Sequence, residues 1–123
     1  MSRKVVKWPS EHQIQKAFFE WLRVKYPAVE DLTWATPNAG KRSLLVAMRM
    51  KSEGLKPGVP DVFMAWPRGQ WHGMFIEFKS KNGRLTDNQE FFINTLAQYG
   101  YYTTVVYSLD EAMEQVEWYL CES

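Results

Sequence analysis

The fold of this chain is decided by two stretches, Gly58-Val59-Pro60-Asp61-Val62-Phe63 and Phe75-Ile76-Glu77-Phe78-Lys79-Ser80. Each contains a short apolar run bounded by polar or turn-forming residues, which is typical of a buried strand. Because side chains alternate across a strand, Glu77 and Lys79 share one face of the second strand. The opposite face carries an apolar stripe of Met74, Ile76 and Phe78. The second strand is therefore expected to place an acid and a base back to back with a core face.

Capping and turn signals divide the rest of the chain into alternating helices and strands. Ser10 with Gln13, and Thr86 with Gln89, form capping boxes that each fix the start of a helix. Helices are expected from residue 10 to Pro27, over 42–53, from 86 to Gly100 and over 108–120, and strands over 32–36, 61–66, 73–80 and 101–107. This order predicts an α/β fold with a mixed central sheet flanked by helices. No repeat or linker interrupts it, so residues 1–123 are expected to form a single domain.

The composition is that of a compact domain with a large apolar core. Hydrophobic residues make up 46% of the 123 residues, which is enough for a core without stabilising staples. The single cysteine, Cys121, excludes an internal disulfide and favours a reducing compartment. No apolar run is long enough for a membrane span or a signal peptide. We therefore expect a cytoplasmic protein that does not contact a membrane.

The net charge of +1 does not itself indicate a nucleic-acid-binding protein. The charges are nevertheless unevenly distributed, because basic residues dominate 41–68 while 110–123 carries five acids and no base. This asymmetry could turn a positive face toward phosphates, or it could be ordinary solvated surface. Charge alone leaves both interpretations open.

The polar residues of the two opening stretches could form a metal site. Antiparallel pairing would bring Asp61 beside Glu77, and two carboxylates with water and phosphate suit Mg²⁺. The main-chain carbonyl of Phe78 is a further candidate ligand, and Lys79 could orient or help deprotonate a water or offset charge on a phosphate. A simpler interpretation also stands, in which Glu77 and Lys79 form a solvated pair and Asp61 is a turn residue after Pro60.

Two residues on the predicted helices could complete the site. Glu11 lies on the same helical stripe as Gln15 and Phe18, which faces the core. It could equally be a first-turn acid that interacts with the helix dipole. Gln89 is the expected partner of Thr86 in a capping box, and it also lies on the inward face of its helix. Its capping role is compatible with a role in the site.

The ordered set of motifs resembles the virus-type replication-repair nuclease domain, VRR-NUC, of the PD-(D/E)XK nuclease superfamily. The resemblance rests on Gly58-Val59-Pro60-Asp61, Glu77-Phe78-Lys79, and Gly83-Arg84-Leu85-Thr86 with Gln89. It extends upstream through Glu11 and the segment 38–42, and downstream to the strand at 101–107. The resemblance therefore covers nearly the whole chain. The chain is most similar in kind to the small stand-alone phage and bacterial members of the family.

The resemblance implies a restriction-endonuclease-like core and a Mg²⁺-dependent DNA endonuclease, with Mn²⁺ as a substitute. It implies a catalytic set of Asp61, Glu77, Lys79 and Gln89, and metal ligation by Glu11, Asp61, Glu77 and the Phe78 carbonyl. Five residues are expected to contact DNA: Asn38, Lys41, Arg42, Arg49 and Lys51. The substrate implied is branched DNA, a Holliday junction or flap arising in replication, recombination or repair, cut by a homodimer. The setting implied is the cytoplasm of a bacterial or phage-infected cell.

Two other function classes remain as alternatives. The chain could be a non-catalytic module that binds DNA junctions or a replication partner, although such a module has no need of the Asp61, Glu77 and Lys79 set. It could also be an interaction protein whose exposed aromatic residues, such as Trp8, Trp66 and Trp71, form a partner surface.

Overall fold

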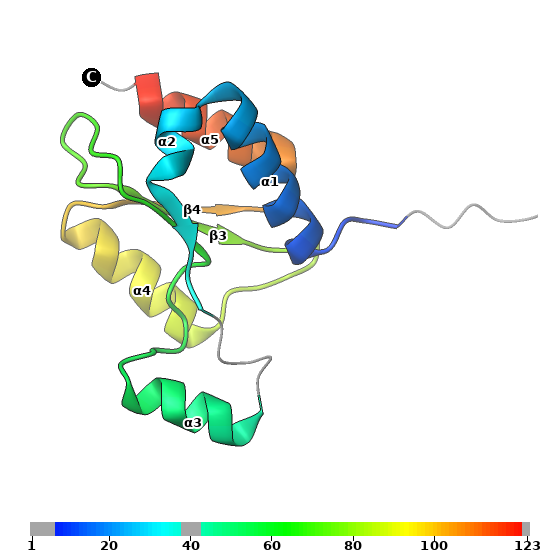
Figure 1. Ribbon diagram of the computed structural model, residues 1–123, viewed down its shortest axis with the longest axis vertical. Helices are drawn as coiled ribbons and strands as arrows, with labels where there is room; N and C mark the ends of the chain where they lie inside the picture. Colours follow the sequence, from blue (N-terminus) through cyan, green and yellow to red (C-terminus); the bar gives the residue numbers. More distant parts are fainter. Residues whose placement is uncertain (1–6, 38–42, 122–123) are drawn as a thin grey trace, which may run out of the picture.

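The computed structural model describes residues 7–37 and 43–121 (Figure 1). Helices and strands follow the predicted alternation, with one additional short helix. The helices are α1 Glu11–Lys25, α2 Pro27–Asp31, α3 Leu44–Ser52, α4 Asp87–Gln98 and α5 Leu109–Cys121. The strands are β1 Thr33–Ala35, β2 Val62–Met64, β3 Met74–Phe78 and β4 Tyr102–Val106. None of the helices in these residues is long and apolar enough to cross a membrane.

The four strands form one mixed sheet in the order β1-β2-β3-β4. β1 pairs antiparallel with β2 and β2 antiparallel with β3, so the segment 67–72 links a hairpin as expected. β3 and β4 are parallel, because helix α4 carries the chain back between them. The predicted mixed sheet flanked by helices is confirmed. The strands are shorter than predicted, since 61–66 and 73–80 pair only over their central residues.

One face of the sheet is covered by two helices and forms the core. Its strand residues are Val62, Met64, Met74, Ile76, Phe78 and Val106, all fully buried. They join one cluster with Ile14, Phe18 and Leu22 of α1 and Ala112, Val116 and Tyr119 of α5. In Figure 1 these two helices lie together on one side of the sheet. The alternating apolar positions therefore meet two amphipathic helices, and this buried area supplies most of the stabilisation.

Helix α4 lies on the opposite face of the sheet (Figure 1). Its backbone is tied to β4 by the Thr103 hydroxyl, which donates to the Ile93 carbonyl at 3.2 Å. No α4 residue is fully buried, and the expected inward residues Phe92, Ile93 and Leu96 are half-buried. This face is therefore less completely covered than the core face. Glu77 lies on it, directly beneath the start of α4.

The helix ends follow the predicted capping chemistry. Both capping boxes form, with Ser10 and Gln13 at the start of α1 and Thr86 and Gln89 at the start of α4. The first helix ends at Lys25, before Pro27, as expected. Pro27 does not return the chain to a loop, however, because it occupies the first turn of α2. Proline is tolerated there because that position needs no N–H donor, and this second helix was not predicted from the sequence.

Helix α3 stands apart from the two layers (Figure 1). It begins after the N-cap Ser43 and none of its residues is buried. Four of its apolar side chains are exposed: Leu44, Leu45, Val46 and Met48. Asn38, Lys41 and Arg42, which were expected to contact DNA, lie outside the described residues.

Candidate metal centre

Asp61 lies immediately before β2 and opposite Glu77. The antiparallel register pairs Val62 with Ile76, so one step further along the ladder Asp61 faces Glu77. The Phe78 amide donates a hydrogen bond to the Asp61 Oδ2 atom at 2.8 Å. Asp61 is therefore bound to the strand of Glu77, as the predicted pairing required, and is more than a turn residue.

The carbonyl of Phe78 also faces the Asp61 side of β3. The Lys79 amide donates to the Val106 carbonyl on β4, so the backbone polar groups of Phe78, one residue earlier, point toward β2. If the β2–β3 register continued two residues beyond Val62 and Ile76, Pro60 would lie opposite Phe78, and proline has no N–H to donate to that carbonyl. On that register, β2 would offer the Phe78 carbonyl no main-chain donor.

Glu77 and Lys79 are buried, with only 1% and 6% of their surface accessible to solvent. The Lys79 Nζ atom lies 3.6 Å from Glu77 Oε2. The interpretation of this face as a solvated strand with a weak surface pair is therefore wrong. Taking both charges out of water is costly, so a pair in this position needs further polar partners to offset the loss of hydration.

Glu11 brings a third carboxylate to the same place. It is exposed at the start of α1, yet one oxygen each of Glu11, Asp61 and Glu77 lie within 4.8 Å of one another. The three acids come from a helix, a strand start and a strand interior. The prediction that helical phase turns Glu11 toward the site is confirmed in its geometry.

The electrostatics of the cluster follow from burial and like charge. Burial, followed by the nearby Asp61 carboxylate, raises the pKa of Glu77 to about 8, against the opposing effect of Lys79. Burial also raises the pKa of Asp61, although the Phe78 hydrogen bond favours its charged form. These carboxylates therefore resist being ionised together unless a positive charge lies between them.

One buried carboxylate oxygen of the cluster is available to bind a positive charge. Glu77 Oε1 has no hydrogen-bond partner among the described residues. An unsatisfied buried carboxylate oxygen is costly and calls for a water, an ion or a functional role. Carboxylate oxygens are the ligands that Mg²⁺ and Mn²⁺ prefer. The donor set therefore fits a divalent cation.

Gln89 performs both of the roles considered for it. Its Oε1 atom accepts from the Thr86 amide at 2.9 Å, which closes the capping box. Its Nε2 atom donates to Glu77 Oε2 at 3.3 Å. The N-terminus of α4 is thereby anchored to the acidic cluster, and the Glu77 oxygen on this side is shared by Gln89 and Lys79.

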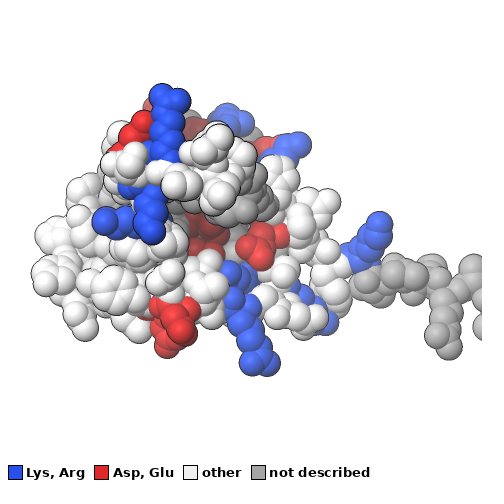
Figure 2. Space-filling view, turned by 90° about the horizontal axis from the view of Figure 1, so that it is seen from below, with Lys and Arg blue, Asp and Glu red and all other residues white. Residues whose placement is uncertain are grey.

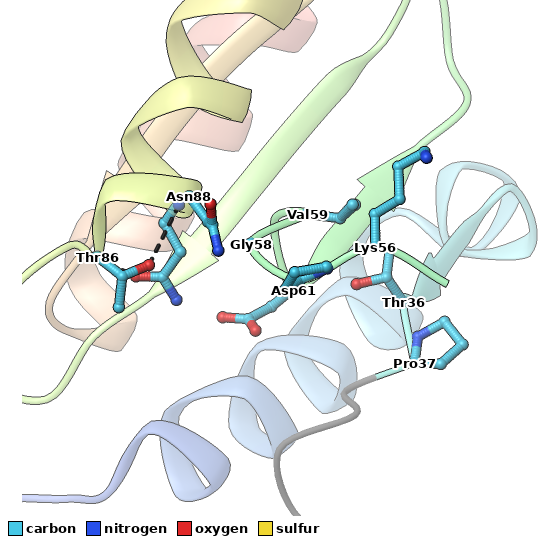
Figure 3. A pocket seen from close by; sticks show the side chains of 10 residues that line it. Thr36, Pro37, Lys56, Gly58, Val59, Asp61, Thr86 and Asn88 are labelled. Atoms are coloured by element: carbon cyan, nitrogen blue, oxygen red, sulfur yellow. Dashed lines mark hydrogen bonds between the residues drawn. The ribbon is translucent and has the colours of Figure 1, made fainter. Parts of the chain in front are cut away.

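A cleft of about 290 Å³ opens onto Asp61. Figure 3 shows the Asp61 side chain extending into it between Thr86 and Lys56. Seen from below in Figure 2, acidic side chains are visible within a hollow and basic side chains lie around it. Thr36, Lys56 and Asn88 also line the cleft and were not predicted from the sequence, although Lys56 directly precedes the turn at Pro57 and Asn88 lies in the capping box of Thr86 and Gln89.

Of the expected DNA contacts, Arg49 and Lys51 lie within the described residues. Both are exposed on α3, away from the carboxylates, and Arg49 pairs with Glu53 at 3.4 Å. The aromatic residues considered for a partner surface divide into two groups. Trp8 is exposed, whereas Trp66 and Trp71 are partly buried against the core and do not form a surface with it.

Comparison with known proteins identifies the family. The VRR-NUC domain matches residues 2–110 of the chain. The chain belongs to the VRR-NUC family. A solved structure of a VRR_NUC domain protein has a TM-score of 0.81 to this VRR-NUC domain at 26% sequence identity, and the match covers 93% of this chain and 90% of the other. No curated protein matches the chain.

Membership accounts for the arrangement as a whole. A VRR-NUC domain is a nuclease domain, and its substrate class is DNA. The acidic cluster of Glu11, Asp61 and Glu77 in this VRR-NUC domain is consistent with a divalent metal site. The resemblance drawn from the sequence motifs is therefore confirmed at the level of the family and the fold.

Proposed function

We propose that this chain is a metal-dependent DNA endonuclease, built as one domain over residues 1–123. The observation that carries the proposal is the buried Glu77, whose Oε1 atom lacks a partner among the described residues while Asp61 and Glu11 lie beside it. A buried acid without a full set of partners is destabilising, so its position is best understood as a ligand position.

Glu11, Asp61, Glu77 and the Phe78 carbonyl would hold the cation, Mg²⁺ with Mn²⁺ as a substitute. When bound, the cation supplies positive charge to the phosphate oxygens and lowers the pKa of water. The Phe78 carbonyl is proposed as a further ligand because the amide of the same residue donates to the Asp61 carboxylate, which places the Phe78 backbone beside the acidic cluster. The hydrogen bond from the Phe78 amide fixes the Asp61 side chain before a ligand arrives.

Lys79 and Gln89 complete the proposed catalytic set. Water attacks phosphorus in line, a new P–O bond forms, one ester P–O bond breaks, and the leaving oxygen takes up a proton. Lys79, held by Glu77 at 3.6 Å, orients or helps deprotonate the water and offsets charge that develops on the phosphate. Gln89 holds the Glu77 carboxylate in position through its 3.3 Å contact.

We propose branched DNA, either Holliday junctions or flaps, as the substrate during replication, recombination or repair. Asn38 and four basic residues, Lys41, Arg42, Arg49 and Lys51, would contact the DNA backbone, and such contacts read shape rather than base sequence. A homodimer is proposed because two sites are needed to cut two strands. The exposed apolar side chains of α3 support a protein contact, since helices that bury nothing in one chain usually pack against another.

The alternative is a nuclease-like module that binds junctions or a replication partner without cutting. Cleavage of labelled four-way junction, flap, single-stranded and duplex DNA should be measured with Mg²⁺, with Mn²⁺ and with EDTA. We expect cutting with either metal and none with EDTA. Junction binding without cutting under either metal would establish the alternative instead.

Two substitutions test the assigned roles within the same assay. Asp61→Asn and Lys79→Ala are expected to abolish cutting while junction binding and the circular dichroism spectrum stay close to wild type. Arg23→Ala, an exposed residue at the far end of α1, is the matched control and should cut normally. Wild-type cutting by Lys79→Ala would remove that lysine from the mechanism.

A further inference from the structure

A second surface lies beside the metal centre and is not used by the proposed mechanism. It is an open groove of about 560 Å³ lined by Lys81, Asn82, Gly83, Arg84 and Tyr107. These residues belong to the turn that follows β3 and to the position directly after β4. The lining carries two cations and an aromatic ring but no acid. Its charge is opposite to that of the neighbouring carboxylate cluster.

The groove adjoins the side chain of Lys79. A Cβ atom placed on Gly83 would lie 3.3 Å from the Lys79 Cδ atom and 3.3 Å from Ser80 Oγ. The turn at 80–83 is closed by a hydrogen bond from the Gly83 amide to the Ser80 carbonyl at 2.8 Å. The backbone of the groove therefore packs directly on the side chain of Lys79. A DNA strand that leaves the metal centre on this side would enter the groove.

Aromatic rings line the outer side of this surface. Trp8 and Tyr107 are 58% and 39% exposed, and the Lys81 Nζ atom lies 3.7 Å from the centre of the Trp8 ring. Both rings, with Lys81, line an adjoining cavity of about 300 Å³. The acid in that cavity, Glu111, is held by the backbone, because its Oε2 atom accepts the Tyr107 amide at 2.6 Å.

We propose that this groove binds a single-stranded arm of the DNA substrate next to the bond that is cut. Lys81 and Arg84 contact the phosphates, and unpaired bases stack on Tyr107 and Trp8. Cations that follow a backbone, interleaved with exposed rings, are how proteins bind single strands without reading sequence. A duplex gains less from these rings, since its bases are already stacked on one another. The inference rests on the proposed nuclease function and specifies its substrate as DNA with an unpaired arm.

Binding is measured first, with the full chain in EDTA so that no cutting occurs. Fluorescence anisotropy compares a labelled twelve-residue oligothymidylate with a blunt duplex of the same length. Tyr107→Ala is expected to weaken oligothymidylate binding by about 5- to 150-fold, the range for loss of one stacked base, and to weaken duplex binding much less. The charge reversals Lys81→Glu and Arg84→Glu should each weaken oligothymidylate binding and reduce its salt dependence.

Matched controls lie at the far ends of two helices. Tyr99→Ala removes a ring that is 72% exposed after the C-terminus of α4, and Arg23→Ala removes an exposed cation near the C-terminus of α1. Both should bind oligothymidylate as wild type does. Equal weakening by Tyr99→Ala and Tyr107→Ala, or no weakening by Tyr107→Ala, would overturn the proposal.

Cleavage separates this inference from the proposed function. Wild-type protein with Mn²⁺ is given bis(p-nitrophenyl) phosphate, a duplex with a single-stranded arm, and the same duplex without the arm. We expect faster cutting of the armed duplex, and loss of that preference in Tyr107→Ala. Failure to hydrolyse all three of these substrates and the four-way junction contradicts the nuclease function itself. Hydrolysis with equal rates for armed and unarmed duplex contradicts the groove alone.

Discussion

Glu77 is both the most costly side chain of the site to bury and the one best placed to bind a cation. It is almost completely buried, faces another carboxylate, and is held on one oxygen by Lys79 and Gln89. Its other oxygen has no partner among the described residues. A residue with these properties weakens the fold unless a ligand binds it, so it couples stability to occupancy of the site.

The protonation of Glu77 predicts how metal binding depends on pH. The pKa of Glu77 is raised to about 8, and metal binds the deprotonated carboxylate. Mg²⁺ affinity should therefore rise as the pH increases toward 8, and binding at pH 6.5 should release a proton. Titration calorimetry in two buffers of different ionisation enthalpy measures this release. Glu77→Gln should bind Mg²⁺ more weakly and without that proton.

The same shift has a consequence for the metal-free fold. A carboxyl whose pKa is higher in the folded state than in the unfolded state stabilises the fold at low pH and loses that contribution as the pH rises through the folded pKa. Melting in EDTA should therefore show stability falling from about pH 5 to pH 8, with a weaker fall in Glu77→Gln. A wild-type melting temperature equal to that of Glu77→Gln across this range would contradict the assignment.

At the scale of elements, the approach of α4 to the start of β2 depends on Gly58. This residue has a φ of 92°, and a Cβ atom there would lie 2.5 Å from the carbonyl carbon of Asn88. The neighbour is backbone in the first turn of α4, so it cannot move aside as a side chain end could. Gly58 therefore lets the helix that carries Gln89 close over the strand start that carries Asp61.

Gly58→Ala is expected to destabilise the protein and to reduce cutting together. Gly54→Ala is its matched control, because Gly54 has a φ of 104° but nothing within 4 Å of the added Cβ. Left-handed backbone costs about 1–2 kcal/mol in either variant, and only Gly58→Ala adds the clash. Urea unfolding and junction cleavage measure the two effects. Equal stability and activity in both variants would show that the close contact is unimportant.

The elements differ in how far the sequence determined them. Features that depend on local spacing could be predicted from the sequence: the capping boxes, the apolar stripe of β3 and the motif around Asp61. The burial of the polar face of β3 was not, because it arises when α4 folds back over Glu77, and strand periodicity does not reveal what covers a face. Helix α2 was not predicted because the missing N–H of Pro27, which is a signal for the end of one helix, is equally suited to the first turn of the next.

The candidate site shows the same division. Asp61 and Glu77 follow from the hairpin, and Glu11 from helical phase combined with the family resemblance. Lys56 and Asn88 are brought to the cleft by the contact at Gly58, which no local pattern predicts. Residues that line a cleft by tertiary contact alone lie beyond what spacing along the chain can indicate.

For the whole molecule, α3 is the element that the described fold leaves without a partner. Leu44 and Leu45 are 75% and 79% exposed, and Met48 is 59% exposed. Such a surface on a small domain favours association, so we expect a dimer that buries the apolar side chains of α3 and leaves Arg49 and Lys51 accessible. Light scattering after size-exclusion chromatography should give twice the mass of one chain for wild type.

The variant Leu45→Glu with Met48→Glu should elute as a monomer and retain its helical spectrum. Val24→Glu, which alters an apolar residue of α1 that is 86% exposed, should remain dimeric. A monomeric wild type would exclude the dimer. A double variant that is still dimeric would place the contact elsewhere.

The contact between α1 and α5 has a consequence for how the protein becomes active during synthesis. Both helices share one core cluster, yet α5 follows α1 only after every strand has been translated. On the ribosome, α1 would lack its contacts with α5 until α5 emerges, and the helix that carries Glu11 would be less firmly held on the sheet. Cutting activity would thus appear late in translation, which keeps an incomplete nascent chain from acting on DNA.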